Sequence, residues 1–216
     1  MVVDSETAVY VYLPPCYDAQ PDRHYPVIYL FPGFGGTNYD FFGAGANRIA
    51  DALILTRETL PFIIVSTGEI FPDLDAQIVT VKILPFIEER YRTRPERRFR
   101  AAAGGSFGGA VAYHLAFRQY DLFGSAGIFG NGAAAGEEDS IRTWLAAIPA
   151  GKRPRVFLNV GESDTYMLER AKILIPLLDE AGIPHMEIFS PGTHSGDYWV
   201  GNFAAYFRWL SMDWRG

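Results

Sequence analysis

The sequence has one cysteine, few histidines and no long apolar run, and each shortage excludes a class of protein. Cys16 is the only cysteine among 216 residues, so an internal disulfide and a cysteine-based metal cluster are both excluded, as is usual in a reducing compartment. The four histidines, His24, His114, His185 and His194, include no pair at the spacing of metal ligands. We therefore expect no metal site.

The balance of charge and the lack of apolar segments limit the partners. The formal net charge is −6, the wrong sign for neutralising phosphates along a duplex, so nucleic acid is not an expected partner. No stretch reaches the roughly 18 to 20 apolar residues of a membrane span, and the first residues lack the pattern of a signal peptide. We expect no membrane span and a cytoplasmic protein, or a secreted one if a leader has been removed.

The length and composition fit one α/β domain covering residues 1–216, with 49% hydrophobic and 20% charged residues. Short apolar runs alternate with segments of helical periodicity. We expect strands at 8–13, 26–31, 62–66, 99–104, 125–129, 155–160 and 186–190, and helices at 47–55, 75–91 (disturbed at Pro85), 107–119, 140–147, 166–181 and 200–212. This alternation predicts a mostly parallel central sheet with helices on both faces. Between Phe129 and Arg155 the chain is too short for a large lid.

A glycine-flanked serine stands between the strand at 99–104 and the helix at 107–119. Gly104, Ser106 and Gly108 have the G-x-S-x-G spacing, which in this context indicates a nucleophile elbow. A serine on so sharp a turn is strained, and the turn closes only if the positions two before and two after it lack side chains. We interpret Ser106 as a nucleophile; a glycine-rich turn without chemistry is the alternative.

A serine hydroxyl needs a base, and position along the chain selects one histidine. His24 and His185 precede strands and so belong to the opposite edge of the sheet. His114 lies eight residues into the helix after Ser106, about 12 Å along its axis. His194 follows the last strand, where ligands bind in such sheets, and is the expected base; a solvated loop histidine is the alternative.

The base needs a carboxylate to orient it, and the loop after the strand at 155–160 offers Glu162 and Asp164. Asp164 is favoured because it lies deeper in the turn before the next helix, although it would also suit the N-cap of that helix. Asp197 is too close to His194 in sequence to orient it, and we expect it to cap the last helix.

Two backbone N–H groups must face the oxygen that becomes negative during acyl transfer. The first is expected from Phe107, directly after the serine. The second is expected from Phe34, in the glycine-rich loop that follows the strand at 26–31; a plain turn is the alternative. Aromatic residues near these loops are candidates for an apolar acyl or aromatic pocket, with core packing as the equal alternative: Phe41, Phe42, Phe71 and Trp199.

Six arginines between positions 90 and 100 are interpreted as a solvated basic rim rather than an anion site. They fall at a helix end and in the following loop, where cations complement the helix dipole.

These motifs together resemble the putative-esterase branch of the α/β-hydrolases. The resemblance rests on Tyr-Val-Tyr-Leu-Pro-Pro-Cys-Tyr-Asp at 10–18, Pro-Val-Ile-Tyr-Leu-Phe-Pro-Gly-Phe-Gly-Gly at 26–36, the serine elbow, Gly-x-x-Asp at 161–164 and Pro-Gly-Thr-His at 191–194. It covers nearly the whole chain. The branch includes esterase D (S-formylglutathione hydrolase), feruloyl and acetyl-xylan esterases, siderophore esterases and mycolyltransferases.

The resemblance implies an α/β-hydrolase fold, no cofactor and a role for each candidate residue. Ser106 is similar to the nucleophile, Asp164 to the acid, His194 to the base, and Phe34 and Phe107 to the oxyanion donors. The sequence departs from the usual pattern at three positions: Pro32 replaces a histidine, Phe107 a methionine and Cys16 a glycine. None of these departures removes a catalytic group.

The expected function is carboxylic-ester hydrolysis through an acyl-enzyme, on small or accessible esters with acetyl, short acyl or feruloyl groups. An acyltransferase or thioesterase with the same residues is the alternative, and a non-catalytic binding protein on this fold is the alternative outside enzymes. The chain starts close to its first strand, so we expect a strand pair usual in the family to be missing. A second subunit could cover the exposed edge, which suggests a homodimer.

Overall fold

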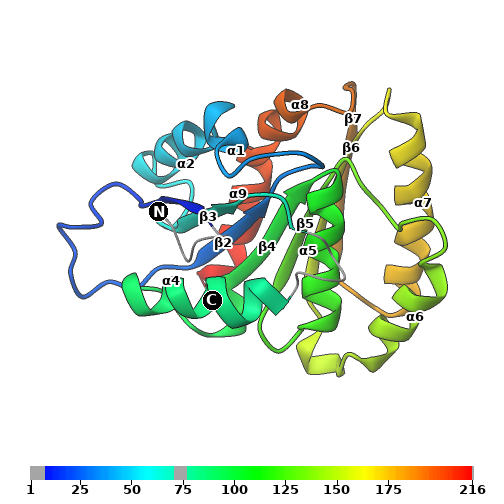
Figure 1. The fold of residues 1–216 in the computed structure, drawn as a ribbon, viewed down its shortest axis with the longest axis horizontal. Helices are drawn as coiled ribbons and strands as arrows, with labels where there is room; N and C mark the ends of the chain where they lie inside the picture. Colours follow the sequence, from blue (N-terminus) through cyan, green and yellow to red (C-terminus); the bar gives the residue numbers. More distant parts are fainter. Residues whose placement is uncertain (1–7, 71–76, 216) are drawn as a thin grey trace.

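A seven-stranded sheet forms the centre of the computed structural model, which describes residues 8–70 and 77–215 (Figure 1). The strand order is β1-β3-β2-β4-β5-β6-β7. The bounds are β1 (Val9–Tyr12), β2 (Val27–Phe31), β3 (Ile63–Thr67), β4 (Arg100–Gly105), β5 (Ser125–Phe129), β6 (Arg155–Gly161) and β7 (His185–Ser190). Only the β1–β3 pair of this sheet is antiparallel. The predicted mostly parallel α/β sheet is confirmed.

Helices cover both faces of the sheet (Figure 1). They are α1 (Asp40–Gly43), α2 (Ala46–Leu55), the π-helical turn η1 (Val79–Ile83), α4 (Leu84–Arg90), α5 (Phe107–Arg118), α6 (Glu138–Ala147), α7 (Thr165–Glu180), α8 (Gly196–Gly201) and α9 (Phe203–Trp214), with 3₁₀ turns η2 (Arg97–Phe99) and η3 (Ala150–Lys152). One face packs against α1, α2, α8 and α9, and the other against η1 and α4 to α7.

Side-chain alternation along the strands supplies a core to each face. In β2, Ile28 and Leu30 point into the core under α2 and α9, while Val27, Tyr29 and Phe31 point into the core under α4 and α5. Because both faces are covered, every residue of β2, β3, β4 and β5 is buried. This explains why these strands are continuous apolar runs in the sequence.

The segment predicted as a helix at 75–91 contains a π-helical turn before its proline. Residues 75 and 76 lie outside the described residues. The Leu84 N–H donates to the Val79 carbonyl, five residues back, and α4 begins immediately before Pro85. Pro85 has no N–H to donate to the preceding turn, so the irregularity predicted at this position takes the form of a π-turn.

The helix predicted at 200–212 is two helices, α8 and α9, separated at Asn202. The Ser195 hydroxyl caps α8 by accepting a hydrogen bond from the Tyr198 N–H. Asp197 lies in the first turn of α8, so the prediction that it caps the last helix is wrong. A serine in an extended conformation directly before the helix meets the geometric need of an N-cap.

Among the helices of the described residues, none has both the length and the apolar composition of a membrane span.

Candidate active site

Ser106 occupies a strained turn between β4 and α5. Its backbone has φ 51° and ψ −120°, a conformation that L-residues rarely adopt. A Cβ on Gly104 would lie 2.4 Å from the Gly108 carbonyl, and a Cβ on Gly108 would lie 2.0 Å from the Phe31 carbonyl oxygen. At both distances the Cβ would clash with the backbone, which confirms the prediction that the turn requires glycine at positions 104 and 108.

Three polar side chains that are far apart in sequence meet at this turn. His194 Nε2 lies 2.8 Å from Ser106 Oγ, and His194 Nδ1 lies 2.5 Å from Asp164 Oδ2. Ser106 follows β4, Asp164 follows β6 and His194 follows β7. The carboxyl ends of parallel strands share one edge of the sheet, so these three residues lie at the same edge. A hydroxyl, an imidazole and a carboxylate in this order form the arrangement that activates a serine.

The hydrogen bonds determine which ring nitrogen carries the proton. A carboxylate only accepts, so Nδ1 of His194 donates to Asp164, and Nε2 of the neutral ring accepts from the Ser106 hydroxyl. The Asp164 side chain is 9% exposed and that of His194 is 37% exposed. The carboxylate is therefore shielded, while the base is open to solvent.

Asp164, rather than Glu162, faces the histidine. Asp164 occupies the N-cap position of α7, yet its side chain makes no capping hydrogen bond. Its carboxylate instead contacts His194, whereas Glu162 is exposed. The N-cap alternative thus describes the backbone position of Asp164 but not the contact of its side chain.

The glycine-rich loop after β2 runs beside the serine. The Gly36 N–H donates to the Gly33 carbonyl, and Gly35 has φ 69°, so residues 33–36 form a tight turn. A Cβ on Gly33 would lie 3.5 Å from Ser106 Cβ. The Phe34 and Phe107 rings meet edge to face with centroids 6.3 Å apart. The two segments predicted to supply oxyanion donors are therefore adjacent; their donor role stays a prediction.

Glu69, which the sequence interpretation missed, holds this loop. The Gly35 N–H donates to Glu69 Oε1 at 3.1 Å. Glu69 comes two residues after β3, and a carboxylate following a strand at the ligand-binding edge is the signal that could have singled it out.

The aromatic residues predicted to line a pocket have different surroundings. Phe41 is 3% exposed and packs against Phe203 in the core, which agrees with the alternative of core packing. Trp199 is 8% exposed, and its ring meets the His194 ring edge to face at 5.0 Å. Phe42 is half-buried beside Tyr10. Phe71 lies outside the described residues.

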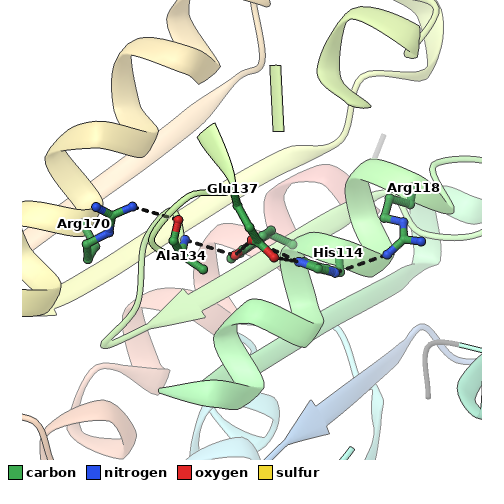
Figure 2. Close-up of polar contacts among 6 residues, drawn as sticks. His114, Arg118, Ala134, Glu137 and Arg170 are labelled. Carbon is green, nitrogen blue, oxygen red and sulfur yellow. Dashed lines mark hydrogen bonds and ion pairs between the residues drawn. The ribbon is translucent and has the colours of Figure 1, made fainter. Parts of the chain in front are cut away.

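Two of the other histidines have partners away from Ser106. His114 is 1% exposed and bonds to Glu137, which directly precedes α6 (Figure 2). His185 bonds to the Ile183 carbonyl and lies 3.2 Å from a Glu187 carboxylate oxygen. Of the candidate bases, only His194 has a hydrogen bond to the serine in the described part of the chain.

The prediction of a solvated basic rim at 90–100 holds in part: Arg90 and Arg98 are exposed, Arg92, Arg94 and Arg97 are half-buried, and only Arg100 is buried. Arg100 is 5% exposed and pairs with Glu88 at 2.5 Å. Arg97 donates to the carbonyls of Tyr120, Phe123 and Lys152. The remaining guanidinium groups lie over aromatic rings, with Arg90 over Phe86, Arg92 over Tyr17, and Arg94 and Arg98 over Phe99. These arginines cover aromatic surface and bind carbonyls, because the planar guanidinium suits both contacts.

An open, mostly parallel sheet with serine, aspartate and histidine at its carboxyl edge defines an α/β-hydrolase-like protein. A family model described as "Putative esterase" matches residues 2–210. The chain belongs to this putative esterase family.

Solved structures share the fold at low sequence identity. A ferulic acid esterase superposes with a TM-score of 0.84 at 22% identity, covering 96% of this chain and 93% of that chain. A ferulic acid esterase of Anaeromyces mucronatus, solved with ferulic acid, gives 0.77 at 19% identity, with coverages of 93% and 83%. An S-formylglutathione hydrolase of Staphylococcus aureus gives 0.70 at 14% identity, with coverages of 95% and 96%.

The curated relatives are longer proteins that match over part of this chain. An endo-1,4-beta-xylanase/feruloyl esterase of Xylanibacter ruminicola is 28% identical over an alignment of 129 positions that covers 54% of this chain and 18% of that protein. An uncharacterized protein of Corynebacterium glutamicum is 30% identical over an alignment of the same length, which covers 54% of this chain and 30% of that protein. The chain thus aligns with less than a third of either relative.

Proposed function

We propose that the protein hydrolyses carboxylic esters through an acyl-enzyme formed on Ser106. The observation that carries this proposal is the 2.8 Å contact between Ser106 Oγ and His194 Nε2, with Asp164 on the other ring nitrogen. His194 takes the hydroxyl proton as Oγ attacks the carbonyl carbon of the ester. Asp164 holds the ring in the tautomer that can accept this proton and stabilises the imidazolium that results.

The tetrahedral intermediate carries its negative charge on the former carbonyl oxygen. The backbone N–H groups of Phe34 and Phe107 bind this oxygen, at the point where the loop at 33–36 runs beside Ser106. When the intermediate collapses, the bond to the alcohol oxygen breaks and His194 returns its proton to the leaving alcohol. Water, deprotonated by the same imidazole, then attacks the acyl group, releases the acid and restores Ser106.

The substrates are small or accessible esters with acetyl, short acyl or feruloyl groups. The connection between β5 and β6 contains only α6 and η3, so this connection does not form a large lid over the site. The His194 side chain is 37% exposed, so water reaches the acyl-enzyme and hydrolysis prevails over transfer to another alcohol. The ferulic acid esterases among the structural neighbours agree with this choice.

The experiment combines labelling by a fluorophosphonate probe with turnover of p-nitrophenyl acetate. The wild-type protein is labelled and active, whereas Ser106→Ala loses labelling and at least about three orders of magnitude of kcat/KM. Ser140→Ala, at an exposed position in α6, is the control and keeps both. Turnover retained by Ser106→Ala would overturn the proposal. Methyl acetate formed in excess over acetate on adding methanol would favour an acyltransferase.

A further inference from the structure

The carbonyl oxygen of Ser106 accepts two hydrogen bonds. The Gly109 N–H donates to it at 2.8 Å from within the first turn of α5, and Asn131 Nδ2 donates at 2.5 Å from the loop after β5. Asn131 is 8% exposed. Both lone pairs of this carbonyl are thus engaged, one by the helix itself and one by a buried side chain from another part of the chain.

The hydrogen bonds at the two ends of the Asn131 side chain determine its orientation. The Gly132 N–H donates to Asn131 Oδ1 at 2.6 Å. A backbone N–H only donates, so the atom facing it is the amide oxygen, and the atom facing the Ser106 carbonyl is the amide nitrogen. Turning the amide over would oppose donor to donor at one end and acceptor to acceptor at the other.

The loop that carries Asn131 is packed tightly against its neighbours. The Gly130 N–H donates to the Asn159 carbonyl at 2.7 Å. A Cβ on Gly132 would lie 2.2 Å from the backbone of Arg170 on α7. Arg170 Nε also donates to the Ala133 carbonyl at 2.5 Å. These contacts leave Asn131 little freedom to move relative to the sheet.

The same loop is held to α5 at its far end. Figure 2 shows Glu137 next to His114 and Arg170 next to Ala134. His114 Nε2 lies 3.1 Å from Glu137 Oε1, and the Tyr113 hydroxyl donates to Glu137 Oε2 at 2.6 Å. Arg170 Nη2 donates to the Ala134 carbonyl at 2.8 Å. The loop is therefore fastened to the helix that begins after Ser106, and Asn131 acts on the serine from a rigid support.

The hydrogen bond from Asn131 reaches the proposed oxyanion donor through one peptide group. The Ser106 carbonyl and the Phe107 N–H belong to the same planar trans peptide and point in opposite directions. We propose that Asn131 is a positioning residue that holds this peptide so that the Phe107 N–H faces the developing oxyanion. A carbonyl that accepts hydrogen bonds also polarises its peptide, which strengthens the N–H as a donor.

The strain at Ser106 explains why such support is needed. With φ 51° and ψ −120°, the residue lies outside the conformations it would adopt unaided, and a strained backbone persists only where its surroundings determine it. Asn131 is linked to the reaction only through the Ser106–Phe107 peptide in this account. Its loss should therefore weaken binding of the transition state and leave binding of the ground state unchanged.

The inference rests on the proposed function and is tested with Asn131→Ala and Asn131→Asp. The aspartate keeps the acceptor for the Gly132 N–H but cannot donate to the Ser106 carbonyl, so it removes the bond with little change of shape. Asn202→Ala is the matched control, because Asn202 Nδ2 donates to the Tyr198 carbonyl at the α8–α9 junction. The readouts are kcat and KM for p-nitrophenyl acetate and the inhibition constant of phenylboronic acid, whose adduct with a serine carries an anionic oxygen.

For both Asn131 variants we expect kcat to fall about tenfold or more, a smaller loss than for removal of an oxyanion donor. KM should stay within about twofold, and the boronate should bind more weakly by about the factor lost from kcat. A merely structural role would lower the thermal midpoint and the fraction of labelled enzyme, without changing boronate affinity of the folded fraction. Asn202→Ala is expected to change neither kcat nor that affinity.

The outcomes separate this inference from the proposed function. If Asn131→Asp retains kcat and boronate affinity within about twofold of the wild type, the positioning role is wrong even though the esterase assignment stands. If Asn131→Ala fails to fold, Asn131→Asp carries the test, because it keeps the hydrogen bond to Gly132. A wild-type protein without turnover, or an active Ser106→Ala, would instead refute the proposed function.

Discussion

Two histidine–carboxylate pairs are associated with α5, and they have opposite surroundings. His194 and Asp164 meet Ser106 at the start of the helix, and the His194 side chain is 37% exposed. His114 and Glu137 meet halfway along the helix, where the His114 side chain is 1% exposed (Figure 2). The same two chemical groups thus form a site open to solvent at the sheet edge and a buried cluster eight residues further on.

The group on the second ring nitrogen distinguishes the two pairs. Nε2 of His194 accepts from a serine hydroxyl, which is a nucleophile once it loses its proton. His114 bonds through Nε2 to Glu137, while Nδ1 faces the Arg118 guanidinium at 3.4 Å. Because the guanidinium only donates, Nδ1 of His114 is the acceptor. Both nitrogens of His114 therefore serve contacts within the protein, and neither faces a substrate.

The electrostatics of the buried cluster also indicate a structural role. The hydrogen bond from His114 is the largest cause that holds the pKa of Glu137 below its ordinary value, and the Tyr113 hydroxyl adds to it. Burial, followed by the hydrogen bond to Glu137, raises the pKa of Tyr113. Glu137 thus stays ionised and Tyr113 stays protonated, which is the combination that keeps their hydrogen bond.

The largest expected difference between the two pairs is in catalysis. His194→Ala should lose about three orders of magnitude of kcat/KM on p-nitrophenyl acetate, because the serine loses its base. His114→Ala should stay within a few-fold of wild-type activity, yet lose about 2 to 4 kcal/mol of unfolding free energy in urea, since Glu137 keeps its charge and loses a donor. Equal loss of activity in both variants would remove the distinction.

A smaller effect concerns the pH dependence of stability. A carboxylate with a lowered folded-state pKa stabilises the fold above its unfolded pKa, and that contribution disappears as the pH falls through the folded-state value. Glu137→Gln should therefore be about 1 to 3 kcal/mol less stable than the wild type at pH 7. The difference should shrink as the pH falls below about 4.5, measured by urea unfolding. The exposed Glu162→Gln is the control; a pH-independent difference at Glu137 would contradict the argument.

The smallest expected effect is a difference in stability between two buried tyrosines, one whose hydroxyl has a hydrogen-bond partner and one whose hydroxyl has none among the described residues. Tyr113→Phe removes the donor to Glu137 and should cost about 1 kcal/mol of unfolding free energy with activity unchanged. The Tyr29 hydroxyl is buried without a hydrogen-bond partner among the described residues. Tyr29→Phe should thus be neutral or slightly stabilising. Thermal melts of both variants measure the contrast, and a larger loss at Tyr29 would speak against it.

Much of the fold and the placement of the candidate triad could be predicted from the sequence. The buried strands are visible in the sequence as apolar runs. A residue that follows a strand lies at the carboxyl edge of a parallel sheet. Applied to Ser106, Asp164 and His194, this rule brought together residues up to 88 positions apart. The rise of the helix excluded His114 as the base, and in the structure His114 bonds to Glu137 instead.

The sequence did not show which residues of distant segments some side chains contact, nor where the last helical segment begins. Of the arginines expected to form a solvated rim, Arg92 lies over the Tyr17 ring and Arg97 donates to the Tyr120 carbonyl, both of which belong to other segments. Phe41, for which a pocket and the core were equal alternatives, packs against Phe203, 162 positions away. Asp197 was expected to cap a helix that Ser195 caps. For the arginines and Phe41 the partner depends on three-dimensional packing, whereas for Asp197 the helical segment begins at Gly196 and not at the expected position 200.

The sequence by itself determined the alternating α/β architecture, the glycines that permit the serine turn, and the order of serine, aspartate and histidine along the chain. These features follow from local sterics and from the periodicity of apolar residues, which act within a few positions. Only the tertiary structure decided that Asp164 turns to His194 instead of capping α7, and that Asn131 holds the Ser106 carbonyl. Both depend on where separate loops meet, because a hydrogen bond requires positions accurate to a few tenths of an ångström that no local pattern encodes.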